Sequence, residues 1–272
     1  MTPILAFDIE TVPDVAGIRL LHDLPKSVPD ADVVAFAQQK RRAQTGGDFM
    51  QHHLHQVVAI SCCMRWGQDK IHVGTIGEIN DSEETMIAKF FDLVETHTPQ
   101  LVSWNGGGFD LPVLHYRALI HGVAAARYWD MGEGDFGDSR DFKWNNYLSR
   151  YHMRHCDLMD VLAMYNGRAN APLDQMAKLC GFPGKMGMDG SKVWDAFQQG
   201  QLQEIRDYCE TDAANTSGRH GTAPAALDPG TVEPDSVIHG HVLRIVGDDG
   251  VAQSRRRAPV SIGVSATLTG TG

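Results

Sequence analysis

The sequence predicts an α/β protein, because short apolar runs typical of strands alternate with segments that have helical periodicity. The chain has 272 residues, of which 42% are hydrophobic, enough for one sizeable domain and an appendage. The strand-like runs are residues 4–7, 55–66, 70–75 and 101–104. Two helical patterns, one after residue 82 and one over residues 203–215, complete the alternation.

The first strand-like run is followed by two acidic residues. Residues 4–7 are apolar and precede Asp8-Ile9-Glu10, so we expect a buried strand that ends in a loop. Because side chains alternate along a strand, Asp8 and Glu10 project to the same side. Neighbouring carboxylates are costly to desolvate unless a cation compensates them, and Mg²⁺ and Mn²⁺ prefer oxygen ligands. Alone, the pattern favours a surface strand end with solvated acids.

Residues 19–50 are polar and either loop-like or loosely helical, and a hairpin and a helix come after them. Residues 55–66 and 70–75 are separated by Gly67-Gln68-Asp69, which predicts a hairpin turn. Residues 81–84, Asp-Ser-Glu-Glu, then form a helix start. The apolar residues of that helix fall on one face: Met86, Ile87, Phe90, Phe91 and Val94.

A second acidic motif lies where a short strand is followed by a helix. After residues 101–104, Asn105 and three glycines make a sharp exit that requires unusual backbone angles. Asp110 follows Phe109, and Pro112 is tolerated in the first turn of the expected helix. Active-site residues often lie at such a junction. A nucleotide-binding loop is excluded, because neither Gly-x-Gly-x-x-Gly nor Gly-Lys-Ser/Thr is present.

The third acidic motif lies on the helix predicted over residues 203–215. Its apolar stripe consists of Ile205, Cys209 and Ala213. Tyr208 and Asp212 are also four positions apart and therefore share a helical face, so a metal-bound water beside Asp212 would be within reach of the Tyr208 hydroxyl. Alone, this pair is typical of a helix with a tyrosine at the edge of the core and a surface aspartate.

Other segments carry weaker candidates. Aromatic and basic side chains interleave in residues 128–151, which fits either a base-stacking loop that uses Trp144 or a surface loop anchored by Trp144 and Tyr147. Lys185 could contact a phosphate, although its Gly/Pro-rich surroundings favour an ordinary turn. The three histidines in residues 52–55 could suggest zinc, but without partner ligands they favour a polar strand entry.

Taken in order, the three acidic motifs resemble the tyrosine branch of the DEDD 3′–5′ exonucleases. The resemblance is greatest to predicted exonucleases related to the proofreading domain of family B DNA polymerases, and it extends to Thr216. Further segments that share it are residues 55–61, 155–162, 181–185 and 189–194. The histidine branch would have a histidine where Asp207 stands, so the tyrosine branch fits.

The resemblance implies a ribonuclease H-like fold, with a mixed sheet flanked by helices, and a two-metal nuclease. Asp8 would bridge two divalent ions, Mg²⁺ or Mn²⁺, that lie about 3.5–4 Å apart and stabilise the attacking and leaving oxygens. Glu10 and Asp212 would complete one ion site, and Asp110 would hold the second. Tyr208 would orient the attacking water, since a phenol with a pKa of about 10 is a poor free base at neutral pH.

The resemblance also implies the reaction, which is hydrolysis of DNA from its 3′ end with release of nucleoside 5′-monophosphates. The expected substrate contacts are Thr11, Asn105, Phe109, Trp144 and Lys185. The expected partner is a single-stranded or frayed 3′ end, with DNA favoured over RNA. Two alternatives stay open: an exonuclease that acts on RNA or short oligonucleotides, because 2′-OH contacts cannot be read from the motifs, and a non-catalytic nucleic-acid-binding module.

Composition narrows the setting in which the chain acts. Neither an apolar run of 18 or more residues nor a basic leader is present, so we expect no membrane span and no signal peptide. Five cysteines without Cys-x-x-Cys spacing indicate reduced core thiols in a cytoplasmic protein. A net charge of −10 argues against tight, salt-driven binding to duplex or long single strands, but fits weak binding of short or frayed ends.

The last segment differs from the rest in composition. Every aromatic residue and every Lys, Met and Cys precedes Ser217. Because residues 217–272 can bury little apolar surface, we expect a domain over residues 1–216 followed by a disordered tail. The family pattern would continue after Thr216 with an aromatic-rich helix, so an alternative hypothesis is that the tail is out of frame. In that case the helix that carries Asp212 would lose part of its packing.

Overall fold

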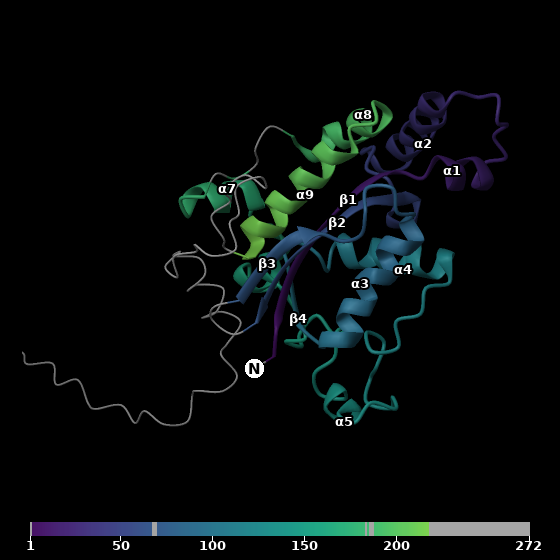
Figure 1. The fold of residues 1–272 in the computed structure, drawn as a ribbon. Coiled ribbons are helices and arrows are strands. Elements are labelled where there is room, and N and C mark those ends of the chain that lie inside the picture. The colour runs from purple at the N-terminus through teal and green to yellow at the C-terminus, as the bar shows by residue number, and fades with distance from the viewer. Residues whose placement is uncertain (1, 67–69, 183, 185–187, 218–272) are drawn as a thin grey trace, which may run out of the picture.

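The computed structural model describes residues 2–66, 70–182, 184 and 188–217 (Figure 1). Its centre is a five-stranded sheet of order β3-β2-β1-β4-β5. The strands are β1 (Ile4–Pro13), β2 (His55–Trp66), β3 (Lys70–Thr75), β4 (Gln100–Ser103) and β5 (His155–Asp157). β2 runs antiparallel to β1 and β3, whereas β4 runs parallel to β1 and β5. The predicted mixed α/β sheet of ribonuclease H-like class is therefore confirmed.

Helices cover both faces of this sheet (Figure 1). The α-helices are α1 (Val15–Leu21), α2 (Asp30–Thr45), α3 (Glu83–His97), α4 (Asp110–His121), α5 (Ser139–Phe142), α6 (Leu158–Leu162), α7 (Leu173–Leu179), α8 (Val193–Gln198) and α9 (Leu202–Ser217). Short 3₁₀ turns are η1 (His52–Leu54), η2 (Gly167–Ala169) and η3 (Gly190–Lys192). α3 and α4 pack on one face through the main apolar core, and α8 and α9 pack on the other.

β1 is longer than expected. The sequence predicted a buried strand that begins with residues 4–7, carries Asp8 and Glu10 on one side and then ends in a loop, whereas the strand observed continues to Pro13. The reason is its antiparallel pairing with β2, which extends from Ile4 opposite Arg65 to Pro13 opposite His55. A register shift between Glu10 and Thr11 marks a bulge in this pairing, directly beside the first acidic motif.

The helices that the sequence predicted with most detail are confirmed. α3 is capped by Ser82, which accepts a hydrogen bond from the Thr85 amide, and its predicted apolar face is buried against the sheet. α4 begins at Asp110 with Pro112 in its first turn, and α9 spans the segment predicted over residues 203–215. The predicted hairpin strands are β2 and β3, while the turn between them lies outside the described residues.

Two segments without a clear sequence pattern are structured. Residues 19–50 contain the end of α1 and all of α2, and these two helices bury a small cluster that includes Ile18, Val33 and Val34. In residues 128–151 the aromatic anchors are Tyr128, Phe142 and Tyr147, all nearly inaccessible to solvent. Trp144 is 76% exposed, so the expectation that it anchors this segment is wrong.

The five cysteines are free thiols, and four of them are buried, as predicted. Cys180 is the exception, because it lies exposed after α7. Among the described residues, no helix combines the length and the apolar character needed to cross a membrane. The tail predicted over residues 217–272, whether disordered or out of frame, lies outside the described residues except for Ser217, the last residue of α9.

Candidate metal centre

Three carboxylates from β1 and α9 meet where α9 crosses the sheet. Asp8, Glu10 and Asp212 each offer an oxygen, and these oxygens all lie within 4.8 Å of one another. We call these three residues the acidic cluster. Asp8 and Glu10 share a strand face because they are two positions apart, and α9 packs on that same face. Glu10 and Asp212 are buried and Asp8 is half-buried, so their charges are held together in a poorly solvated place.

α9 is fixed in this position by its apolar stripe. The residues of that stripe are fully buried: Ile205, Cys209 and Ala213. The Cys209 thiol also donates a hydrogen bond to the backbone carbonyl of Asp8, with 3.3 Å between sulfur and oxygen. The helix is thus anchored to β1 at the residue that begins the acidic cluster, and this contact sets Asp212 opposite Asp8.

Tyr208 lies beside the acidic cluster on the same side of α9. Its pKa is raised far above the usual value, first because the phenol is buried and then because Asp212, Glu10 and Asp8 carry negative charge nearby. The phenol is therefore protonated at neutral pH, where it can act as a hydrogen-bond donor.

Asp110, at the start of α4, approaches the acidic cluster through the main chain of β1. Its Oδ1 accepts a hydrogen bond of 3.2 Å from the amide of Ile9, the residue between Asp8 and Glu10. Burial raises the pKa of Asp110 to about 7, and the negative charges of Asp157 and Asp212 add to that effect. All four predicted acids are therefore brought together at the middle of β1.

The turn before Asp110 needs its glycines for space. The unusual backbone angle is at Asn105, whose φ is +66°, whereas none of the three glycines has positive φ. A side chain at Gly106 would collide with Ser103, and one at Gly108 would collide with Asn105. The predicted strained exit is present, but the strain falls on the asparagine, which tolerates left-handed geometry better than most residues.

Asp157 holds this turn and was not identified from the sequence. Its carboxylate accepts hydrogen bonds of 2.9 Å from the amides of both Asn105 and Gly107, and a third, of 3.1 Å, from Met159 at the start of α6. Burial raises its pKa. The sequence offered one signal, since an aspartate after a short apolar strand is a typical helix cap. It did not indicate that the same carboxylate binds a turn 50 residues earlier.

The donor set fits a hard divalent cation. The acidic cluster consists of carboxylate oxygens alone, which suits Mg²⁺ or Mn²⁺ and does not suit soft metals. Without a counter-ion, three buried or half-buried carboxylates at this separation would repel one another strongly.

The predicted substrate residues are divided between three places. Thr11, Asn105 and Phe109 lie next to the acids, and the Thr11 hydroxyl is hydrogen-bonded to His55 Nδ1 at 2.9 Å. The segment with Trp144 is held at the start of β4, because the Tyr147 hydroxyl donates to the Pro99 carbonyl at 2.6 Å. Asp110 instead follows the end of β4.

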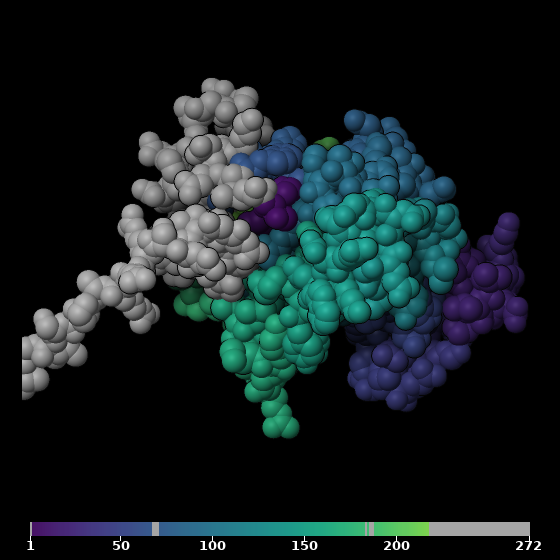
Figure 2. All heavy atoms as spheres, turned by 90° about the horizontal axis from the view of Figure 1, so that it is seen from below, coloured from purple at the N-terminus to yellow at the C-terminus, as the bar shows by residue number. Residues whose placement is uncertain are grey.

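The segment after α5, which contains Trp144, therefore lies away from the acids, on the side of the molecule where Figure 1 labels α5. Figure 2 views that side and shows the segments around α5 covering it. Lys185 lies outside the described residues. The structure thus joins three of the five predicted contacts to the candidate metal centre.

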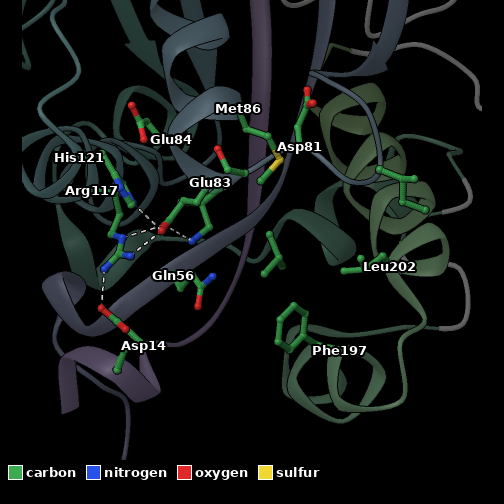
Figure 3. Close-up of a pocket in the computed structure, with 15 residues that line it drawn as sticks. Asp14, Gln56, Asp81, Glu83, Glu84, Met86, Arg117, His121, Phe197 and Leu202 are labelled. Carbon is green, nitrogen blue, oxygen red and sulfur yellow. Dashed lines mark hydrogen bonds and ion pairs between the residues drawn. The ribbon is translucent and has the colours of Figure 1, made fainter. Parts of the chain in front are cut away.

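A cavity of about 480 Å³ is lined by the start of β2 and by residues of α3 and α4 (Figure 3). The charged residues that line it have a structural role. Arg117 bridges Asp14 and Glu83 with hydrogen bonds of 2.6 and 2.7 Å, and Glu83 also accepts from the amide of Val57. His121 completes this network at Glu83. These buried charged groups form hydrogen bonds with one another and join α1, α3 and α4 to β2. Because β2 pairs with β1, the network helps to hold β1 in place.

A mixed sheet that brings four carboxylates and a protonated tyrosine together defines a candidate metal-dependent enzyme. The chain belongs to the family of predicted 3′–5′ exonucleases related to the exonuclease domain of PolB, whose model matches residues 47–217. The match includes Asp110, Tyr208 and Asp212, while Asp8 and Glu10 precede it. This confirms the resemblance inferred from the motifs. No curated protein matches the chain.

Proposed function

We propose that this protein is a divalent-metal-dependent exonuclease that removes nucleotides from the 3′ end of DNA and releases nucleoside 5′-monophosphates. Membership of the exonuclease family supports the reaction class. The observation that carries the proposal is the acidic cluster, in which Asp8, Glu10 and Asp212 place carboxylate oxygens within 4.8 Å of one another. Such a cluster is stable only with positive charge beside it, and divalent ions bound there would stabilise the charge of the scissile phosphate.

The acids would divide the work of holding two ions. Asp8, Glu10 and Asp212 form one set of ligands, because their oxygens converge. Asp110 lies apart from that set, is tied to the Ile9 amide, and is close enough to Asp212 for their charges to interact. Asp110 would hold a second ion, which it would share with Asp8.

Tyr208 would position the attacking water. Because its pKa is raised, the phenol cannot act as a base and instead donates a hydrogen bond. Hydrolysis adds the water hydroxyl to phosphorus and breaks the bond to O3′ of the preceding nucleotide, and the other water proton is transferred to that O3′, which leaves as the new 3′ hydroxyl. A fixed donor in a buried site supports this step by orientation rather than by proton abstraction.

Thr11, Asn105 and Phe109 would contact the terminal nucleotide. Each is the neighbour of an acid in the sequence or lies in the turn that leads to one. The turn itself is held by Asp157, so the position of Asn105 is defined by two hydrogen bonds to one carboxylate. Asn105 Oδ1 lies against Gly108, and Asn105 is half-buried in the turn.

The test is a cleavage assay with matched substrates. The purified protein is incubated with 5′-labelled single-stranded DNA and RNA of one sequence, with Mg²⁺, with Mn²⁺ or with chelator. We expect a ladder that shortens from the 3′ end of DNA, requires metal, disappears in Asp8→Ala and persists in Asp92→Asn, an exposed acid of α3. Faster loss of RNA would support the RNA alternative. Binding of either strand without shortening would support the non-catalytic module.

A further inference from the structure

We propose that Phe49, His52, His55 and Phe109 form an aromatic subsite that stacks a nucleobase of a single-stranded 3′ end. We call these four residues the ring cluster. The inference rests on the proposed exonuclease function, because it assigns the cluster to the same substrate. Phe49 and His52 come from the connection between α2 and β2, His55 is the first residue of β2, and Phe109 precedes α4.

The four rings form one continuous group. The Phe109 ring centroid lies 5.1 Å from that of His55, 5.6 Å from that of Phe49 and 5.8 Å from that of His52. Phe49 and His55 are 5.3 Å apart. These separations are those of contacting aromatic side chains, so Phe109 is surrounded by three rings on the side away from the main core.

Hydrogen bonds fix the two imidazoles. His55 Nε2 donates to the Met50 carbonyl at 3.3 Å, which leaves Nδ1 to accept from the Thr11 hydroxyl at 2.9 Å. His52 Nε2 donates to the carbonyl of Gly108 at 3.0 Å. Both rings are therefore held in place before any ligand binds, and ordering them costs no free energy on binding.

The same hydrogen bonds join the ring cluster to the candidate metal centre. Thr11, the partner of His55, directly follows Glu10, and Gly108, the partner of His52, is two residues before Asp110. Phe109 is the residue before Asp110. A nucleotide whose base contacts the rings would therefore have its phosphate at the acids.

Phe49 is not needed to anchor its own segment. The connection is anchored by Met50 and Leu54, which are buried among the residues of α1 and α2. Phe49 is 61% exposed although it contacts two rings. Its phenyl ring therefore contacts His55 and Phe109 while most of its surface stays open to solvent, as a ring that stacks on a ligand requires.

The ring cluster favours a nucleobase over other ligands. Burial lowers the pKa of His55, so its ring is neutral at physiological pH, and Phe49 and Phe109 carry no charge. Flat, neutral rings stack any of the bases, because every base has a π-face, and such stacking tolerates sequence. This also suits a protein of net charge −10, which gains less than a basic protein from contacts to the phosphate backbone.

The test measures binding in the absence of cleavage. In the Asp8→Ala background, affinity for a 5′-fluorescein-labelled oligothymidylate is compared with affinity for the same oligonucleotide with abasic 3′-terminal positions. We expect Phe49→Ala to weaken binding of the first roughly ten-fold and to leave binding of the second unchanged. The matched control is Phe36→Ala, since Phe36 is 41% exposed on α2 and contacts His22 outside the ring cluster.

The subsite would be overturned if Phe49→Ala and the parent protein bound oligothymidylate with equal affinity. It would also be overturned if Phe49→Ala weakened binding of the abasic oligonucleotide as much as binding of oligothymidylate. A second variant, His52→Ala, should reproduce the direction of the Phe49→Ala effect with an unchanged melting temperature. The proposed function can fail independently of the subsite. If the unmodified protein cleaved no substrate while Phe49→Ala still lost base-dependent binding, the subsite would be supported and the exonuclease activity would be contradicted.

Discussion

The amide of Ile9 donates a hydrogen bond of 3.2 Å to Asp110, and this contact ties the second acidic motif to the centre of the first. Ile9 itself points to the core, so its backbone is held by packing while its neighbours Asp8 and Glu10 face α9. The position of Asp110 relative to the acidic cluster is therefore set by the main chain of β1. Because the bond also stabilises the charged carboxylate, it opposes the effect of burial on that group.

Asp110 should make the stability of the metal-free protein depend on pH. Its pKa is raised to about 7 in the folded state from the usual 3.8, so the folded protein keeps a proton that the unfolded chain loses. The free energy of unfolding should therefore be highest below about pH 4 for this group and should fall as pH rises toward 7.

Asp110→Asn should remove that part of the pH dependence. The check is urea unfolding of both proteins in chelator at several pH values between 4 and 8. Two parallel curves of unfolding free energy against pH would contradict the assignment, because the neutral amide cannot titrate.

Divalent metal should stabilise the folded protein through the acidic cluster. An ion that binds the folded state and not the unfolded chain raises stability by about 2.7 kcal/mol at a concentration one hundred times its dissociation constant. We expect Mg²⁺ or Mn²⁺ to raise the melting temperature of the unmodified protein and of Asp92→Asn, and to have much less effect on Glu10→Gln. Thermal unfolding with and without metal measures this. A similar increase in Glu10→Gln would place the bound ion elsewhere.

The sequence predicted the fold class and the acids for a physical reason. Strand and helix periodicity are local, so the elements that carry Asp8, Asp110 and Asp212 were identified from short segments. Their convergence followed once the three motifs were considered together, because each motif alone also fitted an ordinary surface. The alternation along β1 then placed Asp8 and Glu10 on one face.

The features that the sequence did not reveal depend on partners far along the chain. β1 extends to Pro13 because of pairing with β2, a contact that no local pattern contains. α2 buries few residues, so its apolar face is too narrow to recognise. The second role of Asp157 depends on backbone amides at Asn105 and Gly107, and amides have no sequence signature.

Trp144 illustrates the same dependence on the fold. Trp144 was a candidate stacking residue because aromatic and basic residues surround it in the sequence. Its segment, however, is held at the start of β4, away from the acids. The rings that contact Phe109, the residue before Asp110, include Phe49 and His55. Neither was predicted from the sequence to bind a nucleotide. Aromatic character is visible in a sequence, but the distance between rings is set by the fold.

Tyr208→Phe should separate orientation from folding. The phenol is buried and stays protonated, so its removal takes away a hydrogen-bond donor while the ring still fills the same space. We expect the rate constant for cleavage to fall roughly a hundred-fold, with little change in metal affinity or melting temperature. The measurement is single-turnover cleavage of the labelled DNA.

The pH dependence of that rate provides a second criterion. If Tyr208 acted as a base, the rate of the unmodified protein would rise with deprotonation of a phenol, and Tyr208→Phe would lose this rise. With the pKa of Tyr208 raised far above neutrality, we expect the two profiles to have the same shape between pH 6 and 9 and to differ by a constant factor. A slope present in one profile alone would contradict the positioning role.

Asp157→Ala should damage the candidate metal centre through the turn that carries Asn105. Loss of the carboxylate leaves the amides of Asn105, Gly107 and Met159 without their acceptor, and each buried donor left unsatisfied costs about 1–3 kcal/mol. We expect a destabilisation of at least ~2 kcal/mol and a loss of cleavage that exceeds the loss of folded protein. The matched control is Asp189→Ala, because Asp189 caps η3 by accepting from Ser191 and lies on a separate element. If both variants reduced cleavage only in proportion to the folded fraction, Asp157 would have no effect on the centre beyond holding the fold together.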